Sequence, residues 1–183
     1  MSPAPPSGSG RREVAAYLRA SSAPLQAAIE AQRDLRRDLA PIYAQADEGR
    51  AAAERAVELG RGYGRRFRAL LERCEQLAPP SAAARGDEYL RRWLRFLVMA
   101  CDALAGAPPG GDGTYLGDCR DYLDDARYAA RSLSTMRQRL REAAAGPSSG
   151  GAAKPPRATL KAAPSADQGS VGAQGGGRVS GLS

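Results

Sequence analysis

Three aspartates in one segment have the spacing that a metal site on a helix would need. Asp118, Asp121 and Asp125 lie three and four residues apart, so on a helix they share one face. Carboxylates on facing helices can hold Mg²⁺ together with a pyrophosphate group. That arrangement needs a second acidic helix opposite, and the preceding apolar segment carries arginines instead. We therefore interpret the cluster as acids favoured near a helix N-terminus and paired with arginines, with a Mg²⁺-dependent enzyme as a distant alternative.

Missing residue types exclude several kinds of catalysis. The chain contains no histidine and no asparagine. It therefore cannot form a Ser-His-Asp or Cys-His pair, a histidine-ligated zinc site or a histidine general base. We expect no catalytic residues, no bound metal and no cofactor, and hence a protein that is not an enzyme.

The three cysteines have the spacing of packing residues. Cys74, Cys101 and Cys119 fall on or beside helical apolar stripes and form no CxxC pair. A free cysteine on such a stripe behaves as a small hydrophobic residue. An odd number at wide spacing also argues against a disulfide framework and favours a reducing compartment, which predicts a cytoplasmic location.

The segment GRGYGRRFR, residues 60–68, is the strongest candidate for a basic patch. A stripe of arginines with nearby aromatic residues can bind phosphates or stack on bases. On a helix, however, the two aromatic residues would point into the apolar stripe and away from the arginines. The net charge of +7 is also divided, since +3 of it falls in residues 145–183. A nucleic-acid-associated protein is therefore the second hypothesis, using the basic tail and the patch Arg61, Arg65, Arg66 and Arg68.

The elements that position these residues are helices. With Leu25 at heptad position a, the sixteen consecutive a and d positions from Leu25 to Leu77 include only one strongly polar residue, Gln32. This pattern predicts a long helix over residues 24–78. Pro41 and Gly49 are the points where it could kink or turn.

Two arrangements of the 24–78 segment remain open. A turn near residues 41–49 would give a compact up-down four-helix bundle. A continuous helix would overhang its shorter neighbours and need a second chain to bury its exposed half. The interface would then consist of Leu25, Leu35, Leu39 and Ile42.

The rest of the chain also follows a helical pattern. We expect a short helix over residues 11–20, an apolar helix that includes the single tryptophan, Trp93, and a last helix over residues 115–144. Pro79-Pro80 and the loop at residues 106–113 separate them. No segment alternates as a strand would, and no apolar stretch is long enough to span a membrane.

Together these observations predict an all-α antiparallel bundle of three to four main helices. The bundle, or coiled-coil domain, should occupy residues 11–144, between disordered termini at residues 1–10 and 145–183, which have too few large apolar side chains to fold. The most favoured function is protein–protein interaction, as a scaffold, adaptor or dimerisation module that binds another helix or a second copy of itself.

Overall fold

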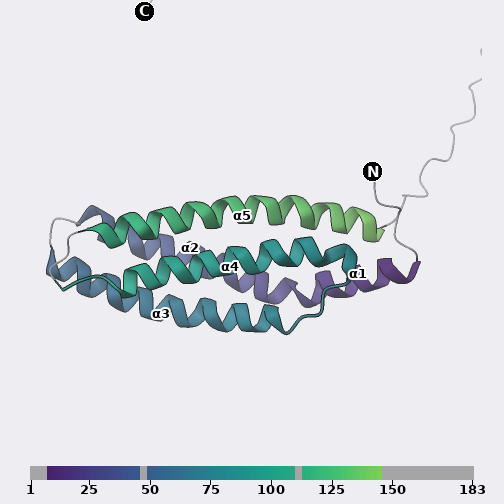
Figure 1. Ribbon diagram of the computed structural model, residues 1–183, viewed down its shortest axis with the longest axis horizontal. Helices are drawn as coiled ribbons and strands as arrows, with labels where there is room; N and C mark the ends of the chain where they lie inside the picture. The colour runs from purple at the N-terminus through teal and green to yellow at the C-terminus, as the bar shows by residue number, and fades with distance from the viewer. Residues whose placement is uncertain (1–7, 46–48, 110–112, 146–183) are drawn as a thin grey trace, which may run out of the picture. The chain divides into compact units, whose positions relative to one another are not determined.

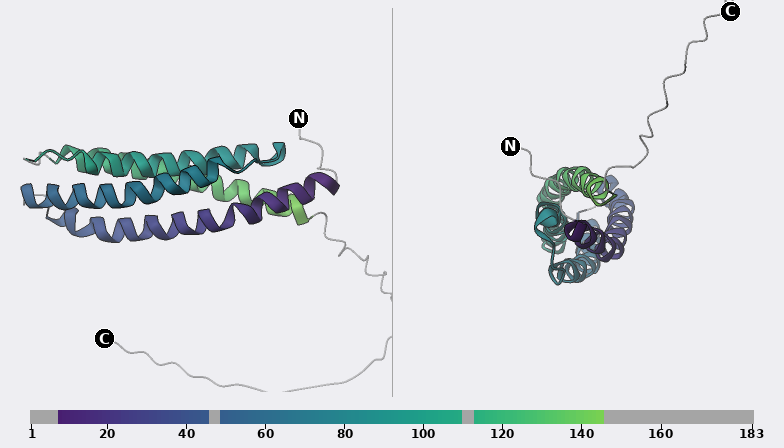
Figure 2. Two further views of the ribbon diagram at one scale, coloured as in Figure 1. Left: turned by 90° about the horizontal axis from the view of Figure 1, so that it is seen from below. Right: turned by 90° about the vertical axis from the view of Figure 1, so that its right-hand side faces the viewer.

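The computed structural model describes residues 8–45, 49–109 and 113–145, and in these ranges the chain forms helices and no strand. Four long helices run side by side and alternate in direction, while α1 extends α2 at one end (Figures 1 and 2). The predicted all-α antiparallel bundle is thereby confirmed. The elements are α1 (Gly8–Ala20), α2 (Ser22–Ala44), α3 (Arg50–Glu75), the 3₁₀ turn η2 (Ser81–Ala83), α4 (Ala84–Ala105) and α5 (Thr114–Ala145).

The ends of the domain differ slightly from the prediction. Helix α1 begins at Gly8, so residues 8–10 belong to the bundle and not to a disordered terminus. The remaining residues of both predicted disordered termini lie outside the described ranges, apart from Ala145, which closes α5. No helix in the described part of the chain has the length and apolarity needed to cross a bilayer.

The continuous helix over residues 24–78 is wrong, and the alternative of a turn near residues 41–49 is right. Helix α2 ends at Ala44 and α3 begins at Arg50. Gly49 precedes α3 with a φ of 56°, a left-handed conformation that glycine adopts without steric cost. Pro41 lies inside the last turn of α2 and does not end the helix.

The heptad pattern continued across this turn for a geometric reason. The last buried residue of α2, Ile42, and the buried Ala53 of α3 are eleven residues apart. Eleven residues correspond to about three helical turns, so the pattern keeps its phase whether the chain continues or reverses. Periodicity alone could not distinguish the two arrangements.

The proposed intermolecular interface on α2 is therefore wrong as well. Leu35, Leu39 and Ile42 are at most 3% exposed and pack into the core of their own chain. Leu25 is partly buried against the same core. None of the three fully buried residues needs a second chain to cover it.

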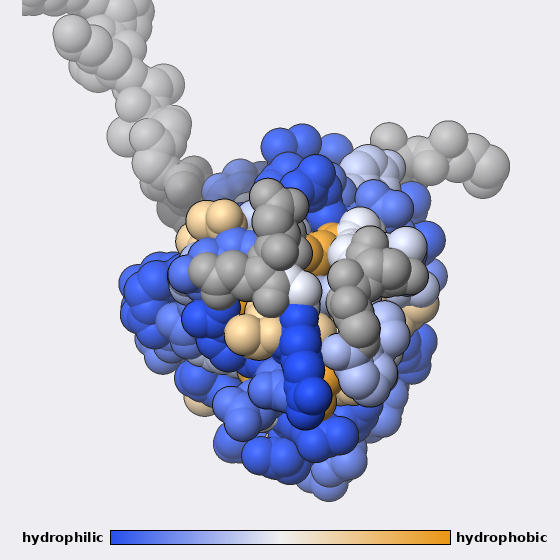
Figure 3. Space-filling model, turned by 90° about the vertical axis from the view of Figure 1, so that its left-hand side faces the viewer, coloured by the Kyte–Doolittle hydropathy of each residue, from blue (hydrophilic) through white to orange (hydrophobic). Residues whose placement is uncertain are grey.

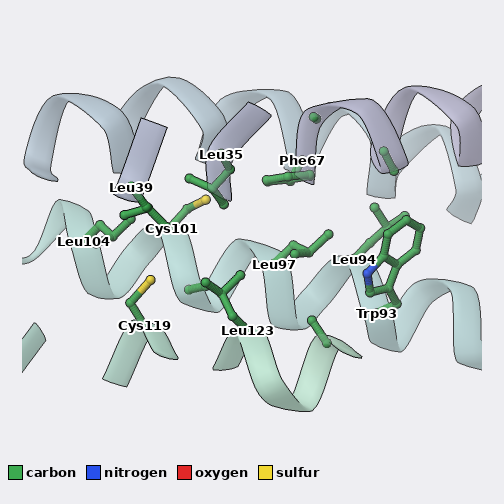
Figure 4. Packing of buried hydrophobic residues seen from close by; sticks show 14 of the residues in the cluster. Leu35, Leu39, Phe67, Trp93, Leu94, Leu97, Cys101, Leu104, Cys119 and Leu123 are labelled. Carbon is green, nitrogen blue, oxygen red and sulfur yellow. The ribbon is translucent and has the colours of Figure 1, made fainter. Parts of the chain in front are cut away.

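The core is centred on α4, as its apolar composition predicts. Side chains of α2, α3 and α5 converge on the buried row that α4 presents, with Leu35 and Phe67 on one side and Leu123 on the other (Figure 4). The buried residues of this row include Leu90, Trp93, Leu94, Leu97, Cys101 and Leu104.

Gly60 of α3 allows the two helices α3 and α4 to approach each other closely. A Cβ atom at Gly60 would lie 2.5 Å from the Cys101 carbonyl oxygen and 2.6 Å from the Ala105 nitrogen. Only a residue without a side chain fits there. Helix α3 continues through Gly60, Gly62 and Gly64 although glycine weakens a helix. At Gly60 the missing side chain is what allows the close contact with α4.

Candidate functional site

The acidic cluster does not form a metal site. Asp118, Asp121 and Asp125 are all exposed on α5. Among the described residues, no group of three cysteine, aspartate or glutamate side chains could hold a metal ion. The neighbouring Asp124 pairs with Arg127 at 2.9 Å, one turn along the helix. The cluster is a charged, solvated helix face.

The basic patch is exposed but partly neutralised. Arg61, Arg65, Arg66 and Arg68 all lie on the surface of α3. Arg66 Nη1 lies 3.8 Å from Asp34 Oδ2, and Arg68 pairs with Asp102 of α4. Such pairs weaken the positive field that phosphate binding requires.

The two aromatic residues of the same segment are engaged in contacts with each other and with α2. Phe67 is fully buried, and Tyr63 stacks on it with ring centroids 6.3 Å apart. The Tyr63 hydroxyl donates a hydrogen bond of 2.8 Å to Asp38 Oδ2 on α2. Stacking on bases needs exposed rings, but Phe67 is buried and Tyr63 is half-buried with its hydroxyl bonded to Asp38.

The cysteines pack in the core and are inert as nucleophiles at neutral pH. Cys74, Cys101 and Cys119 are fully buried and free. Burial raises the pKa of Cys74 and Cys119 to about 11 and that of Cys101 to about 12. The protonated thiol is the unreactive form.

Two buried charged residues were missed in the sequence. The first, Asp87 of α4, is 4% exposed. The Tyr17 hydroxyl donates to its Oδ1 at 2.8 Å, and Arg91 Nε forms an ion pair with Oδ2 at 2.6 Å without the alignment of a hydrogen bond. Burial, and then the bond to Asp87, raises the pKa of Tyr17. This carboxylate is paired and enclosed, so it holds α1 on α4 and is not placed to act on a substrate.

The second is Arg137 of α5, which is 5% exposed. Its Nη1 donates to Ser21 Oγ at 2.8 Å, and its Nη2 donates to the Leu18 carbonyl at 3.3 Å. These bonds join α5 to the junction between α1 and α2. Among the described residues Arg137 forms no ion pair, which is unusual for a buried charge.

The sequence also gave no indication of a groove between α2 and α3, which we name the α2–α3 groove. Its volume is about 590 Å³, within the range of binding pockets. It is lined by Asp38, Pro41 and Ile42 of α2 and by Arg55, Glu58, Leu59, Gly62, Tyr63 and Arg66 of α3.

The end of the bundle where α2 is followed by α3 and α4 by α5 is a weaker candidate for a binding surface. This face is mostly hydrophilic, with small hydrophobic areas between charged residues (Figure 3). A smaller hollow there, of about 420 Å³, has a more polar lining, which includes Arg50, Glu54 and Arg61. The α2–α3 groove is therefore the stronger candidate for a binding surface.

Comparisons of this chain with protein-family models, with curated proteins and with solved structures gave no match, so its function is inferred from its own residues.

Proposed function

We propose that this protein is a non-enzymatic protein–protein interaction module and that it binds an amphipathic helix of a partner in the α2–α3 groove. The observation that carries the proposal is the groove itself, an apolar hollow between two antiparallel helices with charged residues along its edges. An amphipathic helix that lays its apolar face into such a groove is a recurrent mode of peptide recognition.

The floor of the groove suits apolar anchors. Pro41, Ile42 and Leu59 provide aliphatic surface, and Gly62 leaves space where another residue would fill the groove. Apart from its chain neighbours and the backbone of its own helix, no described atom lies within 4 Å of a Cβ built on Gly62. An anchor side chain of the partner would exclude water from this surface, which is the main source of affinity at the centre of an interface.

The edges of the groove suit a partner with charges of both signs. Asp38 of α2 and Glu58 of α3 are acidic, and Arg66 of α3 is basic. The hydrogen bond from Tyr63 is the main cause that lowers the pKa of Asp38, so this carboxylate is ionised at neutral pH. Charges at the rim contribute to partner choice and association rate more than to affinity.

A peptide-display selection tests the proposal. The full-length protein is offered a library of amphipathic helices with apolar residues at positions i, i+3, i+4 and i+7, and the enriched peptides are measured against two variants. Gly62→Leu fills the groove. Gly117→Leu is the matched control, because Gly117 is also an exposed helical glycine with open space around it, but on α5.

We expect peptides that bind the unchanged protein and Gly117→Leu equally and that bind Gly62→Leu at least about tenfold more weakly, a difference of about 1.4 kcal/mol. Both variants should keep their helical circular dichroism. A selection without enriched helices, or peptides that bind all three proteins alike, would contradict the proposal.

Nucleic-acid binding is the second candidate function, favoured by one observation. Arg61 and Arg65 are exposed and, among the described residues, form no ion pair. If they contact phosphates, Arg61→Gln with Arg65→Gln should weaken DNA or RNA binding and reduce its salt dependence by about two charges. Absence of any mobility shift at low salt would remove this candidate.

A further inference from the structure

A second groove lies between α2 and α5, on the other flank of α2, and we name it the α2–α5 groove. Its volume is about 270 Å³, just below the usual range for drug-sized ligands of about 300–1,000 Å³. That size suits a small molecule better than a helix. Its lining includes Leu25 and Ile29 of α2, Trp93 of α4, and Leu133, Arg137 and Arg141 of α5.

Arg137 brings an uncompensated positive charge to this groove. Its two terminal nitrogens donate to a hydroxyl and a carbonyl oxygen, and its Nε is buried without an acceptor among the described residues. Burying a charge costs free energy unless an opposite charge or a full set of hydrogen bonds compensates it. Burial, and then the nearby Arg141, lowers the pKa of Arg137. The groove therefore has an excess of positive charge.

Trp93 provides a second donor without a partner. Its side chain is 2% exposed, and its indole Nε1 has no acceptor among the described residues. Buried tryptophan N–H groups usually find an acceptor. Trp93 and Arg137 line the same groove from different helices, and no described acidic residue lines it. Two unused donors beside a positive charge indicate an anionic acceptor.

Apart from Gln32, Ser134 and Arg141, the rest of the lining is apolar. Leu133 is buried, Leu25 is partly buried, and Ile29 is 47% exposed, one of the largest exposed hydrophobic residues in the described ranges. A strongly hydrated anion would gain nothing from these side chains. An anion with an aliphatic or aromatic body would cover them and release water.

We propose that the α2–α5 groove binds a small amphipathic carboxylate. The carboxylate accepts hydrogen bonds from Arg137 and Trp93, and the apolar body packs on Leu25, Ile29 and Leu133. A single charge suits a groove with one buried arginine better than a doubly charged phosphate ester, whose greater desolvation this small site would not offset. Arg141, which is exposed at the rim, adds attraction at longer range.

The single tryptophan of the chain makes a direct test possible. The full-length protein is titrated with octanoate while the fluorescence emission of Trp93 is recorded. Three further ligands serve as comparisons: 1-octanol lacks the charge, octyl phosphate has a different headgroup, and acetate lacks the apolar body. We expect a saturable change with octanoate and a rise in thermal midpoint. The same change should need at least about tenfold more octanol or octyl phosphate, and acetate should give none.

Three variants locate the binding. Ala130→Leu fills the groove beside Leu133 and keeps Arg137, so it should abolish the octanoate response. Ala143→Leu, at an exposed alanine of α5 outside the groove, is the matched control and should respond normally. Arg137→Gln removes the charge and should make octanoate and octanol equivalent. If Arg137→Gln does not fold, Ala130→Leu decides the question.

Equal responses to octanoate and octanol in the unchanged protein would overturn the proposal, since they would show apolar binding alone. A stronger response to octyl phosphate would overturn the carboxylate. An octanoate response that survives Ala130→Leu would place any binding elsewhere. The proposed function in the α2–α3 groove is unaffected by these outcomes, because Gly62 and Ala130 lie on different grooves.

Discussion

Helices α2 and α4 contribute to the same core but are packed in different ways. On α4, buried side chains face both neighbours, and α3 approaches so closely that Gly60 can carry no Cβ atom. On α2, one stripe is buried, but a groove opens on each flank. α4 therefore holds the bundle together, while the flanks of α2 form the two grooves for which binding is proposed. The predictions below test this division.

The largest effect should come from a charge in the buried stripe of α2. Leu35→Asp places an unpaired carboxylate at a fully buried position, so we expect a loss of about 4 kcal/mol or more and an unfolded chain. The matched change on the exposed flank, Ile29→Asp, should leave the fold intact. Circular dichroism and urea unfolding measure both. A folded Leu35→Asp variant would mean that α2 is not part of the core.

The next effect separates the close α3–α4 contact from the open α2–α3 groove. Gly60→Ala forces a Cβ atom against the backbone of α4, and we expect a loss of about 1–3 kcal/mol despite the better helix propensity of alanine. Gly62→Ala adds a Cβ atom that contacts no neighbouring helix and should stabilise the protein by up to about 1 kcal/mol. Urea midpoints that shift in the same direction for both variants would refute the division.

A smaller effect tests how α1 is held at the end of α2. Tyr17→Phe removes the hydrogen bond to Asp87, whose carboxylate keeps only its ion pair with Arg91. We expect a loss of about 1–2 kcal/mol, the usual cost of a buried hydrogen bond to a charged group. Hydrogen exchange of α1 amides should accelerate more than that of α4 amides. Unchanged exchange in α1 would show that the apolar contacts of Val14 and Leu18 suffice to hold it.

The last effect is absent at neutral pH and is the pH dependence that the buried thiols cause at alkaline pH. Their pKa values are raised to about 11–12, so the folded state holds these protons more tightly than the unfolded chain, whose thiols titrate near pH 9. The contribution of these thiols to the free energy of unfolding is therefore fully present below pH 9 and is lost as the pH rises toward 11. Each thiol contributes a slope of up to about 1.4 kcal/mol per pH unit.

Urea unfolding between pH 7.5 and 10.5 measures this slope, to which the raised pKa of Tyr63, about 12, adds in the same direction. Cys101→Ala should have a shallower slope than the unchanged protein, because it removes the thiol with the highest pKa of the three. A stability that rises from pH 9 to 10.5 would contradict the burial of these thiols.

The fold could be predicted because its helices follow from local patterns. Pro79-Pro80 and the loop at residues 106–113 separated the helices near the observed positions, and the apolar row of α4 identified the core. The turn between α2 and α3 could only be offered as one of two alternatives. Because Ile42 and Ala53 are eleven residues apart, or about three helical turns, the apolar pattern is the same whether the helix continues or the chain reverses.

The grooves could not be predicted, because they depend on how far apart the helices lie and not on the pattern of any one helix. A signal for the α2–α5 groove was nevertheless present. Arg137 lies between Leu133 and Leu140 at the position where the apolar stripe of α5 should continue, and Gln32, the one strongly polar residue of the α2 stripe, lines the same groove. Asp87 interrupts the stripe of α4 three residues before Leu90 in the same way. Each of these polar residues interrupts an apolar stripe, and each lies at a groove or at a buried ion pair in the structure.

The attachment of α1 also has a consequence for the order in which the chain folds. Helices α2 to α5 pair with their neighbours in sequence, which favours rapid formation. Helix α1 instead docks against α5, more than a hundred residues away, where Arg137 donates a hydrogen bond to the Leu18 carbonyl oxygen. Since α1 precedes α5 in the chain, α1 obtains its full set of contacts only after α5 has been synthesised. A chain that ends before Arg137 would lack this anchor and would hold α1 only through its other contacts, such as the hydrogen bond from Tyr17 to Asp87 of α4.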